Sequence, residues 1–125
     1  MTASLRTQLR AAQYDQQRLE SGIEDNLFLC AATPSNGTEP IAEIDSGWSI
    51  QKEEDRIAGT QFIAVRIVET DVNQEKLTAS IMRKVCSLLI GQRRYNIDNK
   101  VDPFEEPRMW LIQCNPTGEV VASDS

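Results

Sequence analysis

The sequence predicts an α+β domain: a small, mostly antiparallel sheet with an N-terminal helix and a second helix, at about residues 74–90, packed on it. Three observations carry this prediction. Residues 61–68 form an apolar run of strand-like composition, a helical repeat of apolar residues follows directly, and residues 4–24 carry a polar helical pattern of their own. Helices gathered on one sheet are typical of the α+β class.

Length and composition indicate one globular domain over residues 1–125. Hydrophobic residues make up 40% and charged residues 26% of the 125 positions, which is typical of a packed domain rather than a disordered chain. No apolar run approaches the roughly 18 residues that span a bilayer, and the first twenty residues lack the apolar segment of a secretory signal. We therefore expect no membrane partner, and we expect the three separated cysteines to be free thiols in a reducing compartment.

The first helix is predicted over residues 4–24. Leu5, Leu9 and Leu19 share one narrow apolar stripe, which Gln16 interrupts, and the remaining surface is polar. A helix with so thin a seam is expected to lie across the edge of a domain or against a neighbouring subunit.

Two strands are predicted before the central one. Residues 26–32 are apolar at nearly every position, as in a strand covered on both faces or a buried turn of helix. Residues 33–40 are a loop by composition, and residues 41–50 alternate like a half-buried strand with a bulge or bend at Gly47. Residues 51–60 form a charged, hairpin-like connection.

The central strand and the second helix form one predicted unit. Residues 61–68 are mostly apolar on both faces, which favours a central position in the sheet. Asp71 and Gln74 resemble a capping box, and Gly91 offers a C-terminal stop. The helix between them is expected to cover residues 61–68 through its apolar positions Leu77, Ile81, Val85 and Leu88.

Residues 92–107 are predicted to form a long loop or arm. The segment has no clear periodicity, contains two prolines and places Phe104 among acidic residues. Loops of this length in compact domains are usually functional or mobile. Residues 108–114 are the last convincing strand, and residues 119–122 are expected to return as a short hairpin partner.

The chain carries no recognisable catalytic constellation. It contains no histidine, its cysteines cannot make a four-ligand zinc site, and no glycine-rich phosphate loop occurs. A nuclease alternative rests on Asp98-Asn99-Lys100 with Asp71 upstream, a pattern too short to be specific. We therefore predict a non-enzyme with no catalytic, cofactor-binding or metal-binding residues.

Charge also limits the choice of partners. A net charge of −6 argues against a domain whose main task is to grip nucleic acid. Arg93 and Arg94, beside Tyr95, suit either contact with a phosphate or base or, as we favour, a cation pair at a helix C-terminus. Interface positions are instead expected along the thin seam and in the long arm. They are Leu5, Leu9, Leu19, Arg93, Arg94, Tyr95 and Phe104.

One pattern resembles a known family. The strand FIAVRIVET runs through the turn DVNQ into the helix LTASIMRKVCSLLIGQ, after a polar N-terminal helix and before a long loop and a late strand. Over residues 56–91 this resembles the tail-completion or tail-terminator (neck) proteins of tailed bacteriophages and related viruses.

The resemblance implies a structural virion protein. Such proteins form homo-oligomeric rings, usually sixfold, at the head–tail junction, where they close the tail tube and join it to the head connector. The implied partners are tail tube and head connector proteins, and the implied location is the virion, after assembly in the host cytoplasm. DNA would pass through the lumen without specific binding, which suits the acidic charge. Head-closure proteins of the neck are often small β-barrels, so two strong helices favour the terminator. A non-enzymatic interaction or assembly subunit outside virions and a small-molecule-binding domain remain the alternatives.

Overall fold

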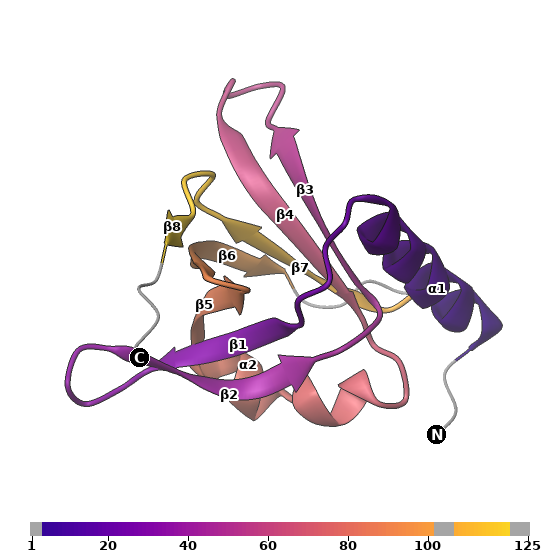
Figure 1. Cartoon of the computed structure of the whole chain (residues 1–125), viewed down its shortest axis with the longest axis horizontal. Helices are drawn as coiled ribbons and strands as arrows, with labels where there is room; N and C mark the ends of the chain where they lie inside the picture. The colour runs from indigo at the N-terminus through magenta and orange to yellow at the C-terminus, as the bar shows by residue number, and fades with distance from the viewer. Residues whose placement is uncertain (1–3, 102–106, 121–125) are drawn as a thin grey trace.

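The computed structural model describes residues 4–101 and 107–120 (Figure 1). It confirms the α+β class, with an eight-stranded antiparallel sheet, an N-terminal helix and one further short helix. In chain order the elements are α1 (Leu5–Glu20), β1 (Leu27–Ala32), β2 (Thr38–Ile44), β3 (Trp48–Glu54), β4 (Gln61–Val68), the 3-10 helix η1 (Asn73–Lys76), α2 (Ala79–Lys84), β5 (Val85–Ile90), β6 (Arg93–Val101), β7 (Met109–Cys114) and β8 (Glu119–Val120).

The sheet is continuous but curved, and it bends at β6. The strands run in the order β2-β1-β5-β6-β7-β4-β3, and β8 adds to β6. The first half of β6 pairs with β5 and the second half pairs with β7, with a register shift between Ile97 and Asn99. Such a bulge bends a strand and increases its twist. The β1–β2 and β3–β4 hairpins therefore form the two ends of the curved sheet (Figure 1).

The larger of two buried apolar clusters joins residues from both ends of this sheet. Leu29 from β1 and Leu88 from β5 belong to the same cluster as Val65 from β4 and Ile112 from β7. Each fully buried side chain of this size contributes about 1.5–3 kcal/mol relative to exposure. The core also contains Trp48 and Trp110.

Several predicted elements are confirmed in place. The strands expected at residues 26–32, 61–68 and 108–114 are β1, β4 and β7, and β4 lies between β3 and β7 as a central strand should. The single strand expected at residues 41–50 is two strands, β2 and β3. Gly47, with a φ of 76°, supplies the turn between them.

The second helix predicted at residues 74–90 is wrong in extent. Only η1 and the six-residue α2 are helical, and residues 85–90 form β5 between β1 and β6. Thr78 caps α2, and Val85 takes an extended conformation that ends it. The apolar run VCSLLI satisfies helical spacing and a buried strand equally well, so spacing alone could not decide.

This correction also changes the expected packing. Leu77, Val85 and Leu88 are core residues, but Ile81 is only partly buried and Met82 takes the inward position on α2. The helix lies against β1 rather than covering the strand at residues 61–68.

The long arm predicted at residues 92–107 is also corrected. Residues 93–101 form β6, the longest strand among the described residues, with Tyr95 and Ile97 packed against the core. Phe104 lies outside the described residues, so its predicted interface role has no structural counterpart here.

Candidate functional site: the outer face of the N-terminal helix

Helix α1 packs against the domain through one face, which carries a threonine, an alanine and a tyrosine. Thr7, Ala11 and Tyr14 are buried, and the Tyr14 hydroxyl donates to Sδ of Met109 at 3.4 Å. Ser4 caps the helix, since its Oγ accepts from the Thr7 backbone N–H at 3.2 Å. The helix therefore begins at a fixed point and rests on β3 and β4 along one side.

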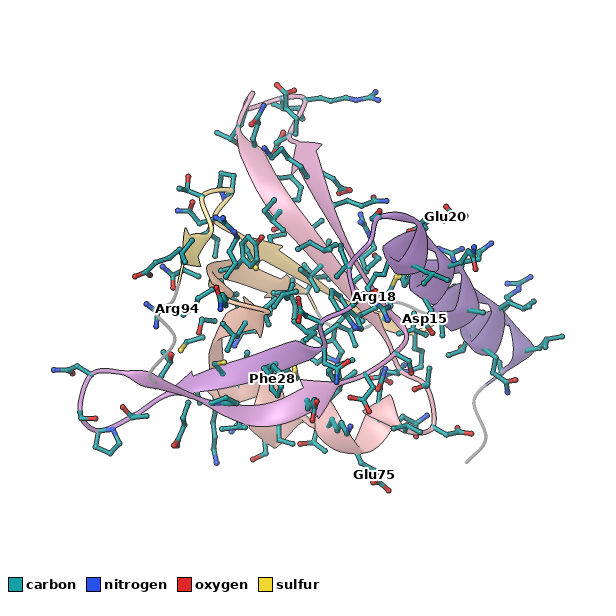
Figure 2. The ribbon with its side chains drawn as sticks, in the orientation of Figure 1. Asp15, Arg18, Glu20, Phe28, Glu75 and Arg94 are labelled. Atoms are coloured by element: carbon teal, nitrogen blue, oxygen red, sulfur yellow. The ribbon has the colours of Figure 1, made fainter. Side chains whose placement is uncertain are left out.

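A polar clamp joins the C-terminal part of α1 to Gly47 and to the first residue of β3. Nη1 of Arg18 donates to Asp15 Oδ1 and to the Trp48 carbonyl, both at 2.6 Å. The same Asp15 oxygen accepts the Gly47 backbone N–H at 2.7 Å, and the Arg18 guanidinium lies 4.4 Å from the Trp48 ring centroid. Figure 2 shows Asp15 and Arg18 on the side of α1 that faces the body of the domain. The clamp therefore sets the rotation of α1 about its own axis.

This rotation leaves the leucines of α1 in solvent. Leu5, Leu9 and Leu19 are 70%, 57% and 70% exposed. The predicted contact of this stripe with the edge of its own domain is therefore wrong, whereas contact with a neighbour remains a prediction. Together with Ala12 these leucines form what we call the α1 seam. A shallow groove of about 490 Å³ lies along it, lined by Leu9, Ala12, Gln13, Gln16 and Gln17.

The predicted interface residues at the start of β6 contact their own domain. Arg93 and Arg94 form hydrogen bonds within it, and Tyr95 packs against its core. Arg93 donates to the Gly118 carbonyl at 2.8 Å, and Arg94 donates to a Glu119 carboxylate oxygen at 2.8 Å. The bond with Glu119, and then its charge, raise the pKa of Arg94 further above its usual value. These residues begin β6 rather than ending a helix, so the predicted cation pair at a helix C-terminus is wrong. Their contacts join β6 to β8, and they add nothing to the α1 seam.

The cysteines divide into two buried thiols and one exposed thiol. Cys30 and Cys114 are buried, and Cys86 is exposed on β5. Burial, together with the nearby Asp98 charge, raises the pKa of Cys114 to about 12. Burial, followed by the influence of Cys86, also raises the pKa of Cys30. Neither buried sulfur is therefore a ready nucleophile.

Lys100, the base of the nuclease alternative, makes structural contacts. Lys100 Nζ donates to the carbonyls of Met82 and Val85 at 2.6 and 2.7 Å, so it closes the C-terminal end of α2. Within residues 4–101 and 107–120, no group of three or more acidic, cysteine or histidine side chains is placed to hold a metal ion.

Asp15 and Arg18 are the residues that sequence reasoning missed. An acid and a base three positions apart on a helix are a recognised signal, but such pairs usually lie on solvated faces. Ile57, in the connection between β3 and β4, is the most exposed large apolar side chain of the described residues, at 99%. The tip of this hairpin stands away from α1 (Figure 1).

Comparisons with known proteins found no relative of this chain. No family model matches it, and no curated protein or solved structure is significantly similar to it. In the described parts of the chain, no helix combines the length and the apolar character that crossing a membrane requires.

Proposed function

We propose that this chain is a structural assembly subunit that acts through contact surfaces rather than an active site. The α1 seam is the observation that carries the proposal. Three leucines are more than half exposed on one face of a helix whose rotation the Asp15–Arg18 clamp fixes. Exposed apolar stripes of this kind are typical of interaction sites.

The resemblance described above gives this proposal its specific form. We propose a ring at the head–tail junction of a virion, with tail tube and head connector proteins as neighbours and DNA passing through an acidic lumen. The net charge of −6 supports such a lumen because it repels phosphates. The choice of terminator over head-closure protein relied on two strong helices. Because α2 has only six residues and the sheet is strongly curved, that preference no longer holds.

Native mass spectrometry and negative-stain electron microscopy of the purified chain test the ring. A closed ring supports the neck role, and a chain that stays monomeric and melts higher with a small molecule would replace it with the ligand-binding alternative. The double variant Leu9→Glu, Leu19→Glu should lower the assembled mass by charging the α1 seam. Ile57→Glu is the control, since it charges a still more exposed apolar position away from α1.

A further inference from the structure

The exposed residues of α1 follow the spacing of a coiled-coil seam. Leu5, Leu9, Ala12, Gln16 and Leu19 are separated by alternating steps of four and three, which is the a/d repeat of paired helices. All five are exposed. The residues that attach α1 to its own domain, Thr7, Ala11, Tyr14 and Arg18, repeat with the same steps on the opposite side of the helix. The repeat is thus wholly available to a second helix.

We propose that the α1 seam pairs with the α1 seam of a second copy of this chain, in antiparallel orientation about a two-fold axis. In the best register Leu9 lies opposite the partner's Leu19, and Ala12 lies opposite the partner's Gln16. One layer packs two leucines together, and the other packs the long glutamine side chain against the small alanine. Each layer occurs twice because of the two-fold axis. This inference rests on the proposed role as an assembly subunit, because it names the occupant of the α1 seam. A two-fold pair closes at two copies, so a ring needs a further contact surface besides the seam.

Charge selects the antiparallel orientation. Arg6 and Glu20 are exposed and flank the seam on one side, one at each end of the helix. Figure 2 shows Glu20 at the end of α1, clear of the sheet. In the antiparallel pair Arg6 faces the partner's Glu20, twice over. In a parallel pair Arg6 and Glu20 lie at opposite ends of the two helices, so neither contact forms.

The polar layer sets the register at a cost in affinity. Gln16 interrupts the leucines, and its amide donates to Glu20 at 3.2 Å along the same helix. Opposite the small Ala12 of the partner, this amide keeps access to the rim of the interface, whereas any slip of one heptad removes the leucine layers. Two four-turn helices bury less than about 1,200 Å², the size of weak interfaces, so we expect a Kd of about 1 µM to 1 mM.

Reversing single charges tests the orientation. Sedimentation of Arg6→Glu alone and of Glu20→Arg alone should show dimerisation weakened at least about tenfold, because each places like charges together twice. An equimolar mixture of the two variants should dimerise at least as well as the unmodified chain, since both flanking contacts then join opposite charges. The double variant Arg6→Glu, Glu20→Arg should do so alone.

Neither charge reversal should destabilise helix α1. Arg6→Glu puts an acid in the first turn and Glu20→Arg puts a base in the last turn, and both complement the helix dipole. Circular dichroism should therefore show unchanged folding. Gln92→Glu, an exposed change in the turn between β5 and β6, is the control for added charge.

Each other outcome decides against the inference. Dimerisation that is unchanged in both single variants would overturn the antiparallel pair, and a chain that stays monomeric up to about 1 mM would overturn pairing altogether. Failure of this inference is distinguishable from failure of the ring, because a two-fold pair closes at two copies. Dimers without rings overturn the neck role alone, and rings indifferent to both charge reversals overturn the pairing alone.

Discussion

Replacing Arg18 by methionine should loosen α1 from the domain. The change removes the Arg18 bonds to Asp15 Oδ1 and the Trp48 carbonyl, both 2.6 Å long, and the contact with the Trp48 ring. A hydrogen bond to a charged group contributes about 1.5–3 kcal/mol, and these contributions are not additive. The Arg18 side chain is 12% exposed but Asp15 is 37% exposed, so solvent screening lowers the total. We expect a loss of about 2–3 kcal/mol in the free energy of unfolding.

Urea unfolding followed by tryptophan fluorescence measures this loss, because Trp48 lies directly beneath the guanidinium. Arg10→Met is the matched control: it lies on the same helix, and its guanidinium is 5.9 Å from the Tyr14 ring centroid. Arginine and methionine have similar helix propensities, so propensity does not enter the difference. If the two variants lose equal stability, within about 0.5 kcal/mol, the clamp does not hold α1 and our account of the exposed leucines fails.

Three further predictions concern the interior. Asn73→Ala should cost about 2–3 kcal/mol, because its buried amide donates to two backbone carbonyls, whereas Asn99→Ala, which removes one exposed bond to a side chain, should cost less than about 0.5 kcal/mol in the same urea titration. Met82→Ala should cost about 2–5 kcal/mol by opening a cavity under α2, and a loss below about 1 kcal/mol would show that α2 does not contribute to the core. A thiol reagent at pH 8 should modify Cys86 in the folded protein. Cys114, with a pKa of about 12, is almost fully protonated there and should react only on denaturation, and mass spectrometry of the labelled peptides would reveal any exception.

Strands with an unambiguous pattern could be predicted from the sequence. Residues 61–68 are apolar on both faces and rich in β-branched side chains, which only a buried strand satisfies, and they form β4. Residues 85–90 carry a continuous apolar run that suits a helix or a strand. Their pairing with β1 and β6, which decides between the two, comes from distant parts of the chain.

The sequence of β6 does contain a strand-like alternation of apolar and polar residues. Tyr95, Ile97 and Val101 alternate with polar residues, apart from the irregularity at the bulge, but the Asn and Asp residues between them lower strand propensity. Tertiary pairing on both sides outweighs that preference.

For the candidate site, the helix was predictable but its orientation was not. An apolar stripe normally faces the core, so the leucines of α1 were the natural choice for the inner face. The observed inner face depends on the Asp15–Gly47 and Arg18–Trp48 contacts, which join positions about thirty residues apart. Its own helical repeat is less apolar than that of the leucines, so the pattern did not mark it as the buried side.

The shared strand β6 also determines when the chain can fold during synthesis. The hairpins β1–β2 and β3–β4 leave the ribosome first, yet each keeps an open edge: β1 waits for β5, and β4 waits for β7. Only β6 connects those two later strands. A nascent chain that lacks residues 93–114 can pair β1 with β5, but β5 still lacks β6 and β4 still lacks β7. Open strand edges of this kind favour chaperone binding and aggregation. Translation of β6 and β7 closes both edges, so the two hairpins should become resistant to protease together rather than one after the other.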